Sequence, residues 1–234
     1  MLSSIARLFH RPNRQSAEGL CTLPVPLSLY EANRVLAFAP HPDDEVLGCG
    51  GTLSLLAKLC PVKVVLVTDG SGAGELPKGT AELRKSEFRQ SLAVLGIEAF
   101  ELWDLPDGAV TDSPDLGRRI ATLLKNDSPD WVFAPSPSEY HRDHARIATA
   151  VDRQCRKCRH VEKLIFYEVW APLQATHCVD VSSCWNQKMD ALAKHATALR
   201  YGDYRAYMEG LNRYRSMYLP NCRYAEAFQV AKLR

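Results

Sequence analysis

Short runs of apolar residues recur along the chain, separated by segments whose apolar positions follow a helical period. The runs are continuous rather than alternating, which is typical of strands buried on both faces of a parallel sheet. We predict strands at 34–40, 63–70, 101–105, 131–137, 163–170 and 178–182. We predict helices at 52–59, 81–95, 114–125, from Arg142 onward, and at 184–199, with Gly96 ending the second of them. Strands that alternate with helices form βαβ units, so the pattern predicts a three-layer α/β domain, Rossmann-like, with a mainly parallel sheet.

The two ends of the chain differ from this regular pattern. Residues 1–30 contain a short apolar set interrupted by Arg7, Arg11 and Arg14, followed by polar residues and a stretch with two prolines. This set is too short to cross a membrane or to form the apolar part of a secretory signal. We therefore expect an N-terminal extension over 1–30 and a single domain over 31–234. The last third of that domain is rich in tyrosine, and we predict that it is helical.

Composition narrows the class of protein. Hydrophobic residues make up 46% of the 234 residues, which is ordinary globular usage and excludes a wholly disordered chain. Lys and Arg number 29 against 27 Asp and Glu, and the net charge of +2 gives no reason to expect nucleic acid as a partner. The eight cysteines lie in a chain with enough aliphatic residues to fold without disulfides, so we expect thiols and a cytoplasmic protein. An α/β enzyme or binding domain without an integral membrane segment remains.

The first group of candidate residues follows the first predicted strand. His41, Asp43, Asp44 and Glu45 come directly after residues 34–40. Ligand sites in parallel α/β sheets form outside the carboxyl ends of the strands. Adjacent carboxylates repel one another, so a fold that gathers them at such a position usually holds a cation or a proton there. Taken alone, however, the group is better explained as a solvated turn with an aspartate that caps the next helix.

A second group changes this balance. His141, Asp143 and His144 follow the strand predicted at 131–137, at the start of the next helix. The ends of two strands in one sheet can meet although they are far apart in the sequence. Three ligands of the His, Asp and His kind with an open position are typical of a catalytic rather than a structural metal site. Together the two groups predict one metal centre at the carboxyl edge of the sheet.

These two stretches resemble the signatures of the PIG-L/LmbE family of zinc-dependent N-deacetylases. Residues 40–45 read PHPDDE and residues 141–144 read HRDH, and weaker similarities extend over roughly residues 34–230. The resemblance implies a metal-dependent hydrolase that removes an N-acyl group, chiefly acetyl, from an amino sugar or glycoside. The partner it implies is this small-molecule substrate, and it is compatible with a homo-oligomer.

Transferred residue by residue, the resemblance makes His41, Asp44 and His144 the zinc ligands, with Fe²⁺ as the alternative metal. Asp43 becomes the general base, and His141 becomes the group that steadies the oxyanion. Physical chemistry agrees with these roles, because zinc with three protein ligands keeps a water whose pKa falls toward about 7. A carboxylate beside that water can take its proton.

Two further acidic residues of the same stretches are expected to support the ligands. We expect Glu45 to orient them. We expect Asp143 to hydrogen-bond an imidazole, that of His141, and so to raise the pKa of that ring.

The candidate substrate-binding residues carry weaker signals. Arg84 matches a family position that faces the sugar, and an ion pair with Glu87 on the helix surface explains it equally well. Asp107 precedes Gly108, and this dipeptide is also a strong turn signal. His195 lies where the family has a histidine, but the residue three positions later departs from the family, so we expect a packing role for it.

Two other functions fit the same residues. His, Asp and His also form the ligand set of non-haem Fe(II) enzymes, although these normally use a β-barrel and need no spare base beside the metal. A non-catalytic binding domain could retain the metal as well, but it has no use for an unligated carboxylate such as Asp43. We therefore predict a zinc-dependent N-deacetylase.

Overall fold

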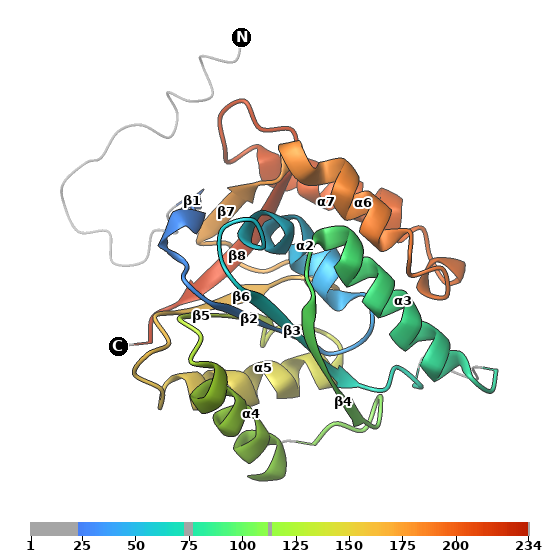
Figure 1. The fold of residues 1–234 in the computed structure, drawn as a ribbon. Coiled ribbons are helices and arrows are strands. Elements are labelled where there is room, and N and C mark those ends of the chain that lie inside the picture. The colour runs from blue at the N-terminus through green and yellow to red at the C-terminus, as the bar shows by residue number, and fades with distance from the viewer. Residues whose placement is uncertain (1–22, 73–76, 112–113, 234) are drawn as a thin grey trace.

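The structure is a computed structural model that describes residues 23–72, 77–111 and 114–233. Most of the expected N-terminal extension, residues 1–22, lies outside the described residues. Within them the chain forms a mostly parallel eight-stranded sheet with helices on both sides, which confirms the predicted α/β fold (Figure 1). No helix in the described ranges combines the length and the apolar character that crossing a membrane requires.

The sheet has the strand order β1-β7-β8-β6-β5-β2-β3-β4. Its strands are β1 (Val25–Pro26), β2 (Val35–Ala39), β3 (Val62–Thr68), β4 (Ala99–Leu105), β5 (Trp131–Pro135), β6 (Lys163–Tyr167), β7 (His177–Asp180) and β8 (Ala225–Ala231). Strand β8 runs antiparallel to both neighbours, β6 and β7, and the other neighbouring strands of the sheet pair in parallel. From β2 the chain continues to β3 and β4 on one side and later returns to β5 on the other. The border between β2 and β5 is therefore the point where the strand order reverses, which is where ligands bind in open α/β sheets.

Helices cover both faces of the sheet and make two cores. The helices are α2 (Asp44–Leu56), α3 (Thr80–Leu95), α4 (Pro114–Asp127), α5 (Arg142–Cys155), α6 (Trp185–Leu192) and α7 (Tyr204–Ser216). Helices α4 and α5 lie on one face, and α2, α3, α6 and α7 lie on the other (Figure 1). Alternate residues of β2 point to opposite faces of the sheet. Ala37 belongs to the core formed with α2 and α3, whereas Leu36 and Phe38 belong to the core formed with α4 and α5. This double burial explains why the strand is apolar at every position.

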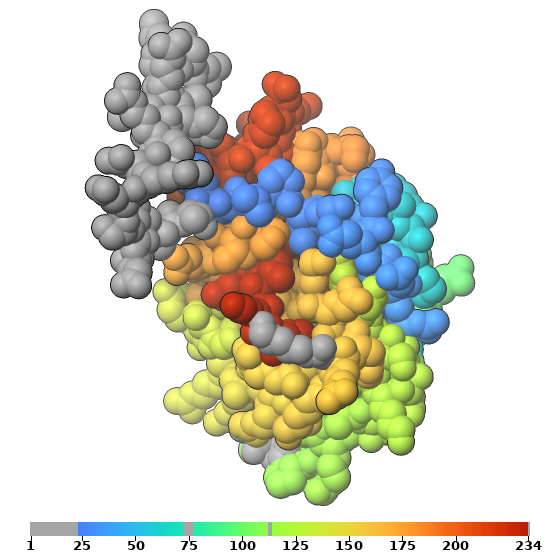
Figure 2. Space-filling view, turned by 90° about the vertical axis from the view of Figure 1, so that its left-hand side faces the viewer, coloured from blue at the N-terminus to red at the C-terminus, as the bar shows by residue number. Residues whose placement is uncertain are grey.

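The C-terminal third departs most from the sequence-based prediction. Its last segment is a strand, β8, rather than a helix, and it inserts between β6 and β7. The helix predicted at 184–199 ends at Leu192, because residues 195–197 turn toward the core, where Thr197 bonds the Glu87 carboxylate. Residues 25–26, which composition placed in the extension, pair with β7. Figure 2 shows the blue N-terminal part of the described chain beside the orange and red C-terminal segments.

Helix α2 begins at Asp44, well before the predicted start at 52, and it is broken in its middle. Cys49 has φ −145° and ψ 16°, which interrupts the helical hydrogen bonds. The carboxylate of Glu226 in β8 accepts the backbone N–H groups of Gly51 at 2.8 Å and Thr52 at 2.7 Å. A buried carboxylate from another element thus caps the second half of the helix.

Lys188 of α6 bonds the helix on the N-terminal side of the same break. Its Nζ donates to the carbonyl of Leu47 at 3.0 Å, to Asn212 Oδ1 at 3.0 Å and to Glu226 Oε1 at 2.7 Å. Lys188 and Glu226 are both fully buried. A buried ion pair is tolerated only when its remaining donors and acceptors are also bonded, and here they are. We call Lys188, Asn212 and Glu226 the kink cluster.

Candidate metal centre

The two predicted groups of residues meet at the point where the strand order reverses. His41, Asp43 and Asp44 follow β2, and His141 and His144 follow its neighbour β5. Because β2 and β5 are parallel and paired, their carboxyl ends lie at one edge of the sheet. His41 and His144, about 100 residues apart in the sequence, therefore lie within hydrogen-bond distance of each other.

Three side chains converge on one point in the way a metal ion requires. His41 Nδ1 lies 3.2 Å from Asp44 Oδ2, His144 Nε2 lies 3.1 Å from the same oxygen, and the two nitrogens are 3.1 Å apart. Ligand atoms about 2.0–2.1 Å from a tetrahedral zinc ion lie roughly 3.3 Å from one another. The triangle therefore fits zinc with little movement. His141 also brings a ring nitrogen within 4.8 Å of the other two histidines.

His41 is oriented through its other nitrogen. Its Nε2 lies 3.0 Å from Asp107 Oδ1 and 3.3 Å from Asp143 Oδ2, so Nδ1 is left to face the metal position. Carboxylates that hold the outer nitrogen of a ligating histidine fix its ring and raise its basicity. Burial lowers the pKa of His41, but the carboxylates of Asp107, Asp143 and Asp44 outweigh it and raise the pKa well above its usual value.

Asp143 supports a different imidazole from the expected one. We expected a hydrogen bond to His141, whereas the carboxylate faces His41 and accepts the backbone N–H groups of Gly108 at 2.7 Å and Val110 at 3.2 Å. The reason is local, because His141 precedes α5 and its Nδ1 accepts the backbone N–H of Asp143 at 3.3 Å. The helix start therefore turns the Asp143 side chain away from that ring.

His141 also differs from the expectation in its charge. Burial and the neighbouring His41 and His144 lower its pKa, and Asp143 only partly opposes them. With Nδ1 accepting a hydrogen bond, the neutral ring carries its proton on Nε2. His141 is thus a neutral donor toward the pocket rather than a cation held by Asp143.

A residue that the sequence analysis missed lies behind His144. Glu139 Oε2 is 3.7 Å from His144 Nδ1, and Glu139 is buried. Its carboxylate accepts the backbone N–H groups of Val169 at 2.6 Å and Trp170 at 3.0 Å. Its position a few residues after β5 was the available signal. Burial lowers the pKa of His144, but Asp44 and Glu139 outweigh it and raise the pKa to about 9.

Asp43 is held in a strained conformation beside the three donors. Its φ is 126°, a value that residues with a side chain rarely adopt. Such strain persists only where the surroundings impose it, and it gathers at functional sites. The carboxylate is buried, and Arg84 Nη2 is 3.7 Å away. Burial and the adjacent Asp44 raise the pKa of Asp43 to about 7, against the opposing charge of Arg84.

Asp44 has the opposite electrostatic situation. Burial would raise its pKa, but the imidazoles of His144 and His41 contact it directly and hold its pKa well below the usual range. Two adjacent aspartates therefore differ in their readiness to take up a proton. Asp44 therefore favours the charged carboxylate, and Asp43, with a pKa of about 7, can exchange a proton near neutral pH.

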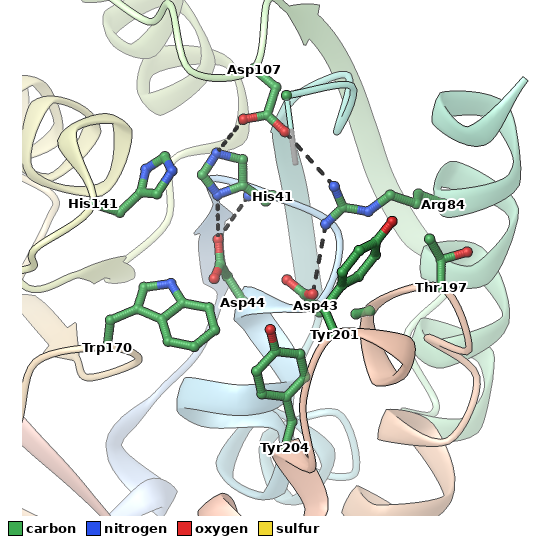
Figure 3. A pocket seen from close by; sticks show the side chains of 12 residues that line it. His41, Asp43, Asp44, Arg84, Asp107, His141, Trp170, Thr197, Tyr201 and Tyr204 are labelled. Carbon is green, nitrogen blue, oxygen red and sulfur yellow. Dashed lines mark hydrogen bonds and ion pairs between the residues drawn. The ribbon is translucent and has the colours of Figure 1, made fainter. Parts of the chain in front are cut away.

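The candidate substrate residues Arg84 and Asp107 both line the pocket next to these groups (Figure 3). Arg84 donates to the carbonyl of Gly70 at 2.7 Å and to that of Pro42 at 3.3 Å, and its Nη1 is 3.8 Å from Asp107. Its guanidinium is thereby fixed at the pocket wall, so the surface ion pair with Glu87 does not form. Glu87 is buried and bonds Thr197 instead.

Glu45 does not orient the metal-binding residues. It is fully buried, its Oε1 is 3.5 Å from His195 Nε2, and it makes no hydrogen bond to His41, Asp44 or His144 within the described residues. Successive residues of a helix point about 100° apart, so Asp44 and Glu45 cannot face the same side. Burial lowers the pKa of His195, but Glu45 outweighs it and raises that pKa. His195 is buried, as a packing role requires, and is also paired with a charge.

The pocket in front of the candidate metal-binding residues has a volume of about 320 Å³. The individual residues of its second wall were not predicted. This wall is formed by Trp170 from the segment after β6, Tyr201 from the segment before α7, and Tyr204 at the start of α7 (Figure 3). The sequence showed many tyrosines in this third of the chain but no feature that singled out the two at the pocket.

Comparison with known proteins gives one family. Residues 36–155 match the family described as PIG-L, GlcNAc-PI de-N-acetylase, and this stretch is just over half of the 234 residues. It contains both groups of candidate metal-binding residues. The chain is 31% identical over 122 residues to the diacetylchitobiose deacetylase of Thermococcus kodakarensis. That alignment covers 49% of this chain and 46% of the relative, so the match spans less than half of the relative's length.

Solved structures extend the similarity of fold to the whole chain. The N,N'-diacetylchitobiose deacetylase of Pyrococcus horikoshii, in complex with its inhibitor MPG, has a TM-score of 0.77 at 20% identity and covers 100% of this chain and 93% of its own. The 4-carboxy-2-hydroxymuconate hydratase of Pseudomonas putida KT2440 has a TM-score of 0.74 at 19% identity, covering 86% and 97%. At such identities the likeness shows the fold alone, and this fold serves more than one reaction.

Proposed function

Because the chain belongs to the PIG-L, GlcNAc-PI de-N-acetylase family, we propose that it is a metal-dependent hydrolase that removes an N-acyl group, chiefly acetyl, from an amino sugar or its glycoside. The observation that carries the proposal is the triangle of His41, Asp44 and His144 donor atoms, with edges of 3.1–3.2 Å, beside the strained Asp43. Deacetylases among the relatives support the reaction class, and the geometry supports the chemistry.

The metal is proposed to be zinc, with Fe²⁺ as the alternative, held by His41, Asp44 and His144. Two imidazoles and one carboxylate with an open position are the donor set of catalytic zinc sites. When bound, such an ion supplies an acidified water and polarises the amide carbonyl. Asp107, Asp143 and Glu139 keep the imidazoles oriented for it.

Asp43 is the proposed general base. It is buried and points into the pocket, and the guanidinium of Arg84 lies 3.7 Å from its Oδ2, so its oxygens remain available to the attacking water (Figure 3). It accepts the proton that the water loses as it attacks the amide carbon. The leaving amine takes up one proton, and we assign the proton held by Asp43 to it.

His141 is the proposed donor to the amide oxygen, which gains negative charge in the transition state. Its Nδ1 accepts a hydrogen bond from the helix start, and Nε2 therefore carries the proton that can be donated. A donor fixed before the reaction costs no reorganisation as charge develops. Arg84 and Asp107 line the same pocket and are proposed to contact the hydroxyl groups of the sugar.

The test is acetate release from a panel of N-acetylated amino sugars and glycosides by the full chain loaded with Zn²⁺. We expect release that stops with a chelator and returns with added metal. Asp43→Asn is expected to lower turnover at least about 100-fold while the bound metal per chain is unchanged. Asp115→Asn, an exposed aspartate of α4, is the matched control and should leave turnover unchanged.

Three outcomes would overturn the proposal in different ways. Full activity of Asp43→Asn would remove the base from the mechanism. Turnover that stops when oxygen is excluded would indicate Fe(II) oxygen chemistry in place of hydrolysis. Metal binding without acetate release from any substrate would indicate a binding domain, or a reaction such as the hydration that a protein of this fold performs.

A further inference from the structure

One part of the pocket wall is held by a side chain that also faces the metal centre. The segment of residues 168–173 follows β6, and its Trp170 is 41% exposed and lines the pocket together with Asp44 and His141 (Figure 3). The backbone N–H groups of Val169 and Trp170 both donate to the carboxylate of Glu139, which comes from the loop after β5. The position of this part of the wall therefore depends on one carboxylate.

The two oxygens of Glu139 divide their contacts unequally. Oε1 accepts the N–H of Val169 at 2.6 Å and that of Trp170 at 3.2 Å. Oε2 accepts the N–H of Trp170 at 3.0 Å, and the same oxygen lies 3.7 Å from Nδ1 of His144. Glu139 is buried, so water does not compete for these contacts. One oxygen thus faces both the pocket wall and a proposed metal ligand.

The ends of the segment are fixed independently of Glu139. Arg215 of α7 donates to the two carboxylate oxygens of Glu168 at 2.9 and 2.6 Å, and it donates to the carbonyl of Leu173 at 2.9 Å. Glu168 also accepts the backbone N–H of Leu173 at 2.8 Å. Residues 168 and 173 are therefore tied to each other and to α7. The middle of the segment, with Trp170, is held by Glu139.

The contact between Glu139 and His144 is longer than a hydrogen bond. Hydrogen bonds between N and O span about 2.7–3.2 Å, and Nδ1 of His144 has no such partner within the described part of the chain. A metal ion on Nε2 leaves Nδ1 as the ring nitrogen that donates, and ligating histidines almost always donate this N–H to a carboxylate or a carbonyl. We therefore expect the distance from Nδ1 to Glu139 to shorten when metal binds.

The carboxylate, rather than the imidazole, is the group that has to move. His144 is fully buried, and its Nε2 already has the spacing to the other two ligand atoms that zinc requires. Glu139 then approaches His144, and the backbone of Trp170 follows it. We propose that Glu139 is a positioning residue through which metal binding at His144 sets the position of Trp170 in the pocket wall. This inference rests on the metal centre of the proposed function and not on the substrate.

The experiment titrates the metal-free full chain with Zn²⁺ and follows tryptophan fluorescence. All four tryptophans lie in the described ranges, and Trp170 is the exposed one, whereas Trp103, Trp131 and Trp185 are buried. Acrylamide, which quenches exposed indoles, therefore reports on Trp170. We expect zinc to reduce the quenching and to shift the emission to shorter wavelength, because the indole is drawn inward. Trp170→Phe should abolish this response, which identifies its source.

Glu139→Gln tests the connection itself. Its amide has one acceptor oxygen, which can keep the backbone of the segment but cannot also accept from His144. At a Zn²⁺ concentration that gives the same bound metal per chain as in the wild type, this variant should lose the fluorescence response. The backbone amide signals of Val169 and Trp170 in the ¹H–¹⁵N NMR spectrum should shift with zinc in the wild type and stay in place in the variant. Glu162→Gln, at an exposed position before β6, is the control and should respond like the wild type.

The outcomes separate this inference from the proposed function. Zinc binding by the wild type without a fluorescence or NMR response at Trp170 would overturn the inference and leave the metal centre intact. A full response in Glu139→Gln would do the same. A wild type that binds no zinc would overturn both. None of these measurements depends on acetate release, so a failure of the proposed deacetylation is recognised separately.

Discussion

Helix α2 contacts two buried groups of charged side chains that differ in how fully they are bonded. At the break in the helix, each charged atom of the kink cluster has partners: Lys188 Nζ has three acceptors, and Glu226 accepts two backbone N–H groups as well as the lysine. At the start of the helix the charged groups are less fully bonded. His144 Nδ1 lies 3.7 Å from Glu139 Oε2 and has no hydrogen-bond partner among the described residues, and Asp43 is strained.

The difference shows how structural and functional charges can be distinguished. An unpaired buried polar group costs free energy, so a folded protein keeps one only where another requirement imposes it. The charged groups of the kink cluster are fully hydrogen-bonded to one another and to the backbone, so the cluster stabilises the fold. The donors of His41, Asp44 and His144 instead lie 3.1–3.2 Å from one another, which fits the ligand set of the proposed metal ion. Four substitutions test this distinction, from the largest expected effect to the smallest.

Asp44→Asn removes one of the three donors of the proposed metal centre. We expect zinc affinity to fall more than about 1,000-fold, because the remaining imidazoles lose the only carboxylate of the ligand set. The wild type should lose thermal stability when a chelator removes the metal, since the ion binds only the folded state. In Asp44→Asn this loss should vanish. Thermal unfolding with and without chelator measures both, and Asp115→Asn serves as the control. A metal-dependent shift that persists in Asp44→Asn would contradict the ligand assignment.

Lys188→Met removes the cation of the kink cluster and should lower the stability of the fold instead. It leaves Glu226 buried without its counter-ion, which costs about 3–5 kcal/mol in the free energy of unfolding and lowers Tm by roughly 10 °C. Metal bound per folded chain should not change. Lys194→Met, at an exposed position near the end of the same segment, is the control and should cost nothing measurable. A loss below about 1 kcal/mol would place the lysine outside the structural core.

Gly48→Ala tests whether the first half of α2 is fixed between the two groups. A Cβ at this position would lie 2.2 Å from the ring of Tyr167 and 3.0 Å from the carbonyl of Glu168. We expect a destabilisation of about 2–3 kcal/mol, measured by denaturant unfolding. Gly210→Ala in α7 is the opposite case, because nothing lies within 4 Å of its Cβ, and it should stabilise the protein by about 0.5–1 kcal/mol. Equal effects of the two substitutions would mean that α2 can shift freely.

Glu139→Gln makes the smallest change. The amide keeps an acceptor for the backbone of Val169 and Trp170 but removes the charge near His144. Zinc affinity should fall about 10-fold, as when other groups behind ligating histidines are removed. Competition with a chelator of known affinity measures it, and Glu82→Gln on the exposed side of α3 should have no effect. An unchanged affinity would show that His144 is oriented without Glu139.

The parts of the site that could be predicted are those encoded in short contiguous motifs. Both candidate metal-binding stretches were found because each follows a continuous apolar run, and parallel strands bring such positions to one edge. The predicted ligands His41, Asp44 and His144 do converge in the structure. The partners of Asp143, Glu45 and Glu139 could not be predicted, because they depend on the direction in which each side chain leaves its helix or turn.

The amino-acid sequence alone determined the alternation of strands and helices, the family resemblance and the two polar groups after β2 and β5, since these depend on local composition and periodicity. The insertion of β8, the ion pair in the break of α2 and the aromatic second wall of the pocket were decided only by the tertiary structure. Lys188, Glu226 and Trp170 lie far in the sequence from the helix α2 or the pocket residues beside which they pack. Their roles depend on packing between elements, for which a single sequence carries no periodic signal.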